Sequence, residues 1–263
     1  MFRTALFTAL TALSLVPSLA AADVRDHNAA PTVVLVHGAF ADGASWNKVI
    51  AILQSWGVRT VATHSPLTSL SDDVQATRRA IDNASGPVVL VGHSWGGTVI
   101  TQAGTDPRVS ALVYVAAFAP DVGQNTGDQG RGFPVPHGLS GLREHDGFLW
   151  LNEHTVAEDF APELKPRDAR LIFSTQAPIK ASAFGEAVTQ AAWRGKPSWY
   201  VIARNDRMIA PELQADTARR IGAQVRSIAS GHAAPLSQPR EVAYAILEAA
   251  GVKAEEPAAH AGG

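Results

Sequence analysis

The chain has 263 residues, of which 46% are hydrophobic and 17% are charged, and it contains no cysteine. Its 22 lysines and arginines stand against 24 aspartates and glutamates, so the net charge of −2 provides no basic field for nucleic acid or an anionic membrane. The lack of cysteine excludes disulfides, thiolate zinc sites, iron–sulfur clusters and cysteine nucleophiles.

Residues 1–22 have the layout of a secretory signal peptide. Arg3 precedes an apolar stretch over residues 5–16, and a proline and several small residues follow it. The small residues suit cleavage after Ala20 or Ala22. The apolar stretch is shorter than the ~20 residues that a bilayer span needs, so an uncleaved anchor is the weaker alternative. We therefore expect an exported protein, periplasmic or secreted, with no membrane attachment after cleavage.

Short apolar runs rich in valine and isoleucine predict the strands of the mature chain. Because these runs are continuous rather than alternating, both faces of the strands are expected to be buried, as in a parallel sheet. Helical patterns separate the runs, and this alternation with right-handed crossovers predicts a doubly wound α/β fold, mostly parallel, with helices on both faces. The predicted strands cover residues 32–36, 58–62, 88–91, 111–116, 199–203 and 225–229.

Capping signals mark the expected ends of the helices. Serines are expected at N-caps, and proline in a first turn or glycine after a last turn brackets a helix. The predicted helices run from a cap at Ser45 to a stop at Gly57, from a cap at Ser71 to about Ile81, between Pro211 and Gly222, and over residues 239–250.

Residues 121–196 do not follow the alternation. We find no convincing strand there, but loop signals and then helix-like patterns at 156–164, 167–175 and 182–193. The stretch is too long for a simple connection, so we interpret it as a cap inserted over one end of the sheet. The remainder of 23–263 is expected to form one domain, with a disordered tail at about 253–263.

The most informative segment is Gly92-His93-Ser94-Trp95-Gly96, which lies between a predicted buried strand and the helical pattern at 98–103. A serine on a sharp strand-to-helix turn adopts a strained backbone, where side chains at Gly92 and Gly96 would collide. The helix that follows points its N-terminal amides at the reacting oxygen. Ser94 is therefore the predicted nucleophile.

A serine hydroxyl needs a base to take its proton, and histidine is the usual one. Of the nine histidines, His232 follows the last predicted strand, in a loop of small residues before the final helix, so it is the predicted base. His93 is expected to be a packed support. His145 and His154 are expected to lie in a solvated polar stretch, and no metal site is predicted.

The base in turn needs a carboxylate to hold its tautomer. Asp206 follows the predicted strand at 199–203, so it reaches the same sheet edge as Ser94 and His232. Asp121, which follows the preceding strand, is the alternative acid. We favour Asp206 because its strand neighbours the one that leads to His232, and because the chain order serine, aspartate, histidine is that of a known class of triads.

The loop His37-Gly38-Ala39-Phe40 follows the first predicted strand. Because Gly38 has no side chain, the loop backbone can turn toward Ser94. The amides of Ala39 and Trp95 are the predicted oxyanion donors, and loss of one such donor typically lowers the rate by ~10²-fold or more. The alternative is an ordinary turn.

Taken together, these motifs resemble the α/β-hydrolase superfamily over essentially the whole mature chain. The motifs are His37-Gly38-Ala39-Phe40 with Trp46, Gly92 to Gly97, Asp206 with the segment after it, and Gly231-His232, and they look like the compact methylesterase and hydroxynitrile lyase branch. The resemblance implies a six-stranded core, a helical cap, no cofactor and the triad and oxyanion roles described above. Lyases of this branch place a lysine directly after the catalytic histidine, where this chain has Ala233.

The expected function is therefore that of a cofactor-free serine carboxylic ester hydrolase. Its substrate is expected to be a small or medium apolar or aromatic ester, and Phe40, Phe133 and Trp150 are the predicted pocket residues. The alternatives are a lyase or another cofactor-free reaction on the same fold, and a ligand-binding relative with little turnover. Neither nucleic acid nor a membrane is expected as a partner, and the oligomeric state is left open.

Overall fold

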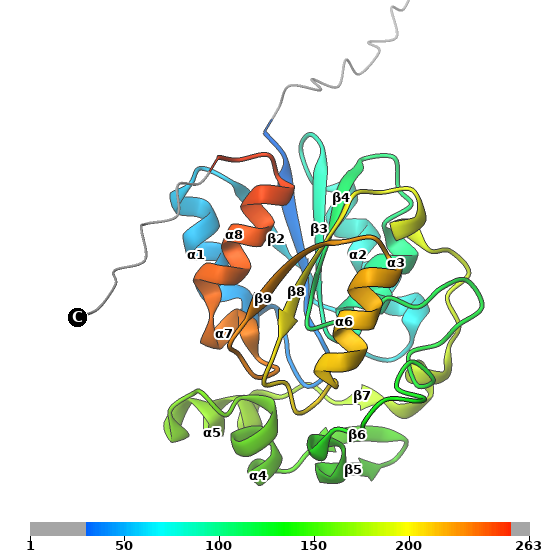
Figure 1. The fold of residues 1–263 in the computed structure, drawn as a ribbon, viewed down its shortest axis with the longest axis vertical. Coiled ribbons are helices and arrows are strands. Elements are labelled where there is room, and N and C mark those ends of the chain that lie inside the picture. Colours follow the sequence, from blue (N-terminus) through cyan, green and yellow to red (C-terminus); the bar gives the residue numbers. More distant parts are fainter. Residues whose placement is uncertain (1–29, 254–263) are drawn as a thin grey trace, which may run out of the picture.

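A computed structural model describes residues 30–253, so the predicted signal peptide and nearly all of the predicted tail lie outside the described residues. Its centre is a parallel sheet with strand order β2-β1-β3-β4-β8-β9 (Figure 1). The strands are β1 (Thr32–Val36), β2 (Arg59–Ala62), β3 (Val88–His93), β4 (Val109–Val115), β8 (Ser198–Ala203) and β9 (Gln224–Ile228). Each end lies within two residues of its predicted position, and the predicted fold class is confirmed.

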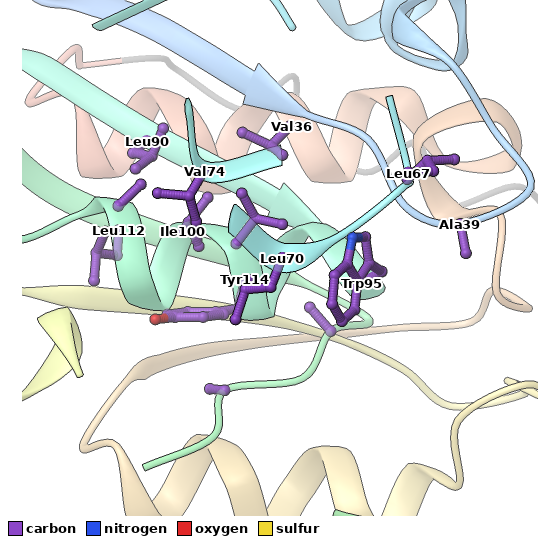
Figure 2. Close-up of a cluster of buried hydrophobic side chains, with 14 of the residues drawn as sticks. Val36, Ala39, Leu67, Leu70, Val74, Leu90, Trp95, Ile100, Leu112 and Tyr114 are labelled. Carbon is purple, nitrogen blue, oxygen red and sulfur yellow. The ribbon is translucent and has the colours of Figure 1, made fainter. Parts of the chain in front are cut away.

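Helices cover both faces of the sheet, and this explains the continuous apolar runs of the inner strands. In β1, Val33 and Leu35 pack with one helical layer, and Val34 and Val36 pack with the other. The first layer contains α1 (Asn47–Ser55) and α8 (Pro239–Ala249), and the second contains α2 (Leu70–Asp82), α3 (Trp95–Ala103) and α6 (Pro211–Arg220). Figure 2 shows side chains of β1, β3 and β4 meeting those of α2 and α3.

Two predicted helix caps are wrong. Asp42, rather than Ser45, caps a 3₁₀ turn at Gly43–Trp46 that leads into α1, and its carboxylate accepts a hydrogen bond from the Ala44 amide. The cap of α2 is Ser69, two residues before the predicted Ser71. Each true cap accepts a hydrogen bond from an amide at the start of the helix through a side-chain oxygen. Neighbouring serines and aspartates can make the same bond, so the sequence does not show which of them is the cap.

The segment between β4 and β8 is not purely helical, so the prediction that it holds no strand is wrong. It contains an antiparallel sheet of β5 (Leu142–His145), β6 (Phe148–Leu151) and β7 (Ile179–Lys180). Asp146 and Gly147 join β5 to β6 with positive φ angles of 51° and 78°, as a two-residue hairpin turn requires. Figure 1 shows this sheet and α5 below the ends of the central strands.

The helix predicted at 167–175 is confirmed, but the other helical structure in the same segment is shorter than predicted. The structure has α4 (Glu153–Thr155), which continues as a π-helical turn at Val156–Phe160, and α5 (Pro166–Thr175). The predicted helix at 182–193 is wrong, because only 3₁₀ turns at Ala181–Gly185 and Ala192–Arg194 form. A short helix, α7 (Ala234–Ser237), precedes α8. None of the helices within residues 30–253 has the length and hydrophobicity of a membrane span.

Candidate active site

Ser94 lies at the turn between β3 and α3 with a strained backbone, φ 53° and ψ −119°. Its carbonyl accepts a hydrogen bond from the Phe118 amide at 3.2 Å, which ties the turn to the chain after β4. A Cβ at Gly92 would lie 2.5 Å from the Gly96 carbonyl oxygen, and one at Gly96 would lie 2.5 Å from the carbonyl oxygen of Val36. Glycine is therefore required at both positions for the turn to form.

His232 and Asp206 meet at the same edge of the sheet, and both are buried. The Nδ1 of His232 lies 2.8 Å from Oδ2 of Asp206, at hydrogen-bond distance. The other carboxylate oxygen, Oδ1, accepts the amides of Met208 and Ile209 at 2.7 and 2.9 Å. The site thus presents an oriented imidazole and a fully bonded carboxylate, with Ser94 on the same edge. No hydrogen bond links Ser94 to His232 within the described residues.

Gln214 is a site residue that sequence reasoning missed. Its amide nitrogen donates to Oδ2 of Asp206 at 2.8 Å, and its oxygen accepts the Ala203 amide at 3.0 Å. The only signal for it was a polar residue on the buried stripe of α6, eight residues after Asp206. The alternative acid, Asp121, pairs instead with Arg194, whose hydrogen bonds lower the pKa of the Asp121 carboxyl.

His93 packs against His232, in keeping with the prediction that it is a packed support. Its Nε2 donates to the carbonyl oxygen of His232 at 2.9 Å, and the two ring centroids are 4.8 Å apart. Burial lowers the pKa of His93 to about 3, so the ring is neutral at ordinary pH. His145 is exposed and lies 3.4 Å from Asp146, and the described residues contain no cluster suited to a metal ion.

The loop after β1 approaches Ser94 as closely as its glycine allows. A Cβ on Gly38 would lie 2.8 Å from the Cβ of Ser94. The Ser65 amide donates to Nε2 of His37, so Nδ1 carries the ring proton and donates to the Gly38 carbonyl at 2.9 Å. Because a peptide carbonyl and the next amide point in opposite directions, this bond directs the Ala39 amide away from His37. Neither that amide nor the one of Trp95 donates to another described residue.

Residues at and just after the end of the π-helical turn bind the two residues that flank His232 in the chain. The Ala233 amide donates to the Phe160 carbonyl at 3.0 Å, and the Gly231 amide donates to the Glu163 carboxylate at 2.5 Å. The ring of Phe160 also packs edge-on against His232, with centroids 5.2 Å apart. We refer to residues 160–163 as the cap brace. The cap therefore contributes directly to the position of His232.

Loss of the Glu163 carboxylate is expected to lower kcat about tenfold with little change in KM, because the Gly231 amide loses its acceptor and the base loop loosens. Glu163→Gln keeps an acceptor oxygen and is expected to stay within about threefold of wild type. Glu186 is the matched control, since its carboxylate also accepts a core amide, that of Leu70, but away from His232. If Glu186→Ala lowers kcat as much as Glu163→Ala, the cap brace has no specific role.

A second buried carboxylate, that of Asp73, holds the side chain of the residue after Ser94. Asp73 on α2 accepts the indole Nε1–H of Trp95 at 2.7 Å and the Leu67 amide at 2.8 Å. The carbonyl of Leu67 in turn accepts the amide of Lys180 from β7, so this carboxylate also anchors the chain that meets the cap. Burial, with lesser effects of Asp72 and Glu186, raises the pKa of Asp73 to about 6.

This raised pKa predicts an unusual dependence of stability on pH. Between the ordinary value of 3.8 and about 6, the folded state holds the Asp73 proton and the unfolded chain does not. The contribution of Asp73 to the free energy of unfolding is therefore present at low pH and falls as pH rises through this window. Relative to Asp73→Asn, wild type is expected to gain about 1 kcal/mol on going from pH 7.5 to 5. Urea unfolding of both proteins at the two pH values measures it, and a constant difference contradicts it.

The three predicted pocket residues lie in different places. Phe40 lines an apolar cavity of about 220 Å³ with His93 and Ala233, which we name the Phe40 cavity. Phe133 lines a second cavity of about 220 Å³, the Phe133 cavity. Trp150 lines neither of these cavities, but a shallow hollow on the cap with Arg143 and Phe173. Its side chain lies on an antiparallel strand that the helical prediction of the cap did not include.

The fold agrees with comparisons to known proteins. The model of the alpha/beta hydrolase family matches residues 33–245, and the chain belongs to that family. A probable hydrolase, R7, of Phoma sp. is 28% identical over 244 residues, 84% of this chain and 99% of the relative. A pyrethroid hydrolase of Sphingobium wenxiniae is 28% identical over 257 residues, 85% of this chain and 89% of the relative. The crystal structure of a pyrethroid hydrolase from Sphingobium faniae shares the fold with a TM-score of 0.72 at 20% identity, covering 84% and 97% of the two chains.

Proposed function

We propose that this protein is a serine carboxylic ester hydrolase, with Ser94 as nucleophile, His232 as base and Asp206 as the acid that orients it. The observation that carries the proposal is the coincidence at one sheet edge of a serine at φ 53° and a buried histidine–aspartate pair joined at 2.8 Å. The names of its relatives, hydrolases that include a pyrethroid hydrolase, support the same reaction class. The proposed steps need no cofactor.

In the proposed mechanism, Nε2 of His232 takes the proton of the Ser94 hydroxyl as its oxygen attacks the ester carbonyl. The amides of Ala39 and Trp95 donate to the oxyanion that forms. His232 then gives its proton to the departing alcohol, which leaves an acyl group on Ser94. Water, deprotonated by the same histidine, releases the acid. Asp206 keeps the ring proton on Nδ1, so that Nε2 is free to accept.

The test is covalent labelling with a serine-directed fluorophosphonate beside an ester assay of the protein without residues 1–22. We expect wild type to cleave p-nitrophenyl acetate and to lose that activity in step with the attachment of one label to Ser94. Labelling at another serine, or cleavage that survives full labelling, contradicts the assignment. Cleavage of a cyanohydrin without cleavage of any ester favours the lyase alternative, and stoichiometric ligand binding without turnover favours a receptor.

We also propose that the protein is exported through its first 22 residues. The support is the order of charge, apolar stretch and small residues in that segment. N-terminal sequencing of the protein from fractionated bacterial cells tests it. A start at residue 21 or 23 in the periplasm or medium is expected, and a full-length protein that stays in the cytoplasm contradicts it.

A further inference from the structure

The chain at the end of the π-helical turn contacts both loops that carry the proposed acid and base. We name residues 159–163 the bridge; it consists of Asp159 and the cap brace. We propose that the bridge sets the spacing of Asp206 and His232, so that Asp159 and Arg207 are positioning residues for ester hydrolysis. This inference rests on the proposed function and adds to it the element of the cap that keeps the pair together.

The first contact of the bridge is with the loop that carries Asp206. The Asp159 carboxylate is buried, and it accepts a hydrogen bond at 2.5 Å from Nε of Arg207, the residue directly after Asp206. Nδ1 of His137 lies 2.9 Å from the same carboxylate oxygen. Burial of a carboxylate costs free energy unless polar or charged partners face it. The packing of Asp159 therefore favours the one position of the loop in which Arg207 reaches it.

A second part of the cap holds the same loop through its backbone. The Gly138 amide donates to the Arg207 carbonyl at 2.9 Å. A Cβ on Gly138 would collide with Sδ of Met208 and would lie 2.8 Å from the Arg207 carbonyl oxygen, so the cap and the loop are in direct contact. Oδ1 of Asp206 in turn accepts the Met208 amide. A shift of the loop relative to the cap therefore moves the Asp206 carboxylate.

The second contact of the bridge is with the loop that carries His232. The cap brace supplies the acceptors for the amides of Gly231 and Ala233, and the Phe160 ring packs on the imidazole. Pro162 also packs against the backbone of Gly231, where an added Cβ would lie 3.0 Å from two carbons of the proline ring. The bridge thus fixes the histidine loop on the same short piece of chain that fixes the aspartate loop.

The two loops are also joined directly, but on one side only of the pair. The Asn205 amide, one residue before Asp206, donates to the carbonyl of Ser230, two residues before His232, at 3.0 Å. The bridge contacts the residues that follow Asp206 and those on either side of His232. The hydrogen bond between the acid and the base therefore lies between this direct tie and the bridge. Without the bridge, the loops could turn about the direct tie.

The bridge itself is a short and stiff segment. The Ala161 amide donates to the Val156 carbonyl at 2.9 Å, five residues earlier, which closes the π-helical turn at its end. Pro162 follows directly, and its ring fixes the backbone φ angle. A stiff segment transmits a displacement from one end to the other, so release of either end is expected to disturb the spacing of the pair.

A double-variant cycle tests this. Arg207→Ala and Glu163→Ala each release one end of the bridge, and each is expected to lower kcat about tenfold with KM within about twofold of wild type. The double variant is expected to lose no more than about threefold beyond the larger single loss, because the loops are no longer connected once either end is free. If the two losses multiply, to about 100-fold, each residue supports only its own loop and the inference is overturned. Wild-type kcat in Arg207→Ala also overturns it.

The matched control is Arg108→Ala. Arg108 is also a partly buried arginine paired with aspartates, Asp82 and Asp106, but it lies before β4, at the opposite edge of the sheet. This variant is expected to keep wild-type kcat. A loss equal to that of Arg207→Ala would mean that any broken ion pair slows the enzyme, and would overturn the inference. Circular dichroism and urea unfolding confirm that each variant is folded under the assay conditions.

A measurement without substrate separates this inference from the proposed function. In ¹⁵N-histidine-labelled protein, the proton on Nδ1 of His232, bonded to Asp206, gives a downfield ¹H resonance. We expect this resonance in wild type and Arg108→Ala, and its broadening or loss in Arg207→Ala and Glu163→Ala. An unchanged resonance in either of these two variants, or its absence from wild type, overturns the inference. A wild-type protein that shows the resonance but cleaves no ester contradicts the proposed function alone.

Discussion

Replacement of Ser94 by alanine is expected to lower kcat for ester hydrolysis by ~10⁴-fold or more. In the proposed mechanism the hydroxyl oxygen forms the acyl-enzyme, and neither neighbour in the turn, His93 or Trp95, carries a hydroxyl that could replace it. The oxyanion amides remain in the variant, so a weak residual rate from their donors is expected. The fold is expected to be unaffected, because the Ser94 hydroxyl has no hydrogen bond to another described residue.

Steady-state kinetics on a chromogenic ester measures this loss, and the control is Ser174→Ala on the exposed side of α5. The control is expected to keep wild-type kcat, because its hydroxyl bonds only the Arg170 carbonyl of its own helix. A Ser94→Ala protein that retains more than about 1% of wild-type kcat would show that another group performs the attack.

The second large effect is expected for Asp206→Asn, with a fall in kcat of ~10⁴-fold at pH 7. The structure indicates how the asparagine would sit. Two backbone amides, those of Met208 and Ile209, point at Oδ1, so the amide oxygen has to take that place. The NH₂ group then faces Nδ1 of His232 and the Nε2 donor of Gln214. An NH₂ donor opposite Nδ1 stabilises the tautomer with its proton on Nε2, which cannot accept the proton of Ser94.

The matched control for this variant is Asp121→Asn at the alternative acid. Its carboxylate is bonded to Arg194 at the surface, so we expect kcat within about threefold of wild type. The tautomer itself can be followed by ¹⁵N NMR of a histidine-labelled sample. A larger loss in Asp121→Asn would assign the acid to Asp121, and equal losses would contradict a specific role of Asp206.

The sequence was sufficient for the central sheet because its inner strands are short, continuous apolar runs rich in valine, with helical patterns between them. It was insufficient for the cap sheet. In β5, Arg143, Glu144 and His145 are polar and exposed, so the strand has no apolar run, and its register depends on pairing with β6. The pair Asp146-Gly147 was the local signal for a hairpin.

The site residues likewise fall into two groups, those that the sequence predicted and those that it did not. The positions of Ser94, Asp206 and His232 follow from which strands end at one edge, and an ordered list of strands is enough to predict them. Gln214 and Glu163 act across elements, and no local pattern pairs Glu163 with Gly231, which lies 68 residues further along the chain. Similarly, the burial of Asp73 against Trp95 depends on the packing of α2 on α3. Such contacts require the tertiary structure.

The cap brace has a consequence for how substrate range can diverge among relatives of this chain. A foreign cap transplanted onto this sheet would have to bring its own acceptors for the amides of Gly231 and Ala233, or the histidine loop would lose its support. Exchange of whole caps is therefore disfavoured. Substitutions elsewhere in the cap, on α5 and on the β5–β6 hairpin, leave the brace intact and are the less disruptive way to change the cap.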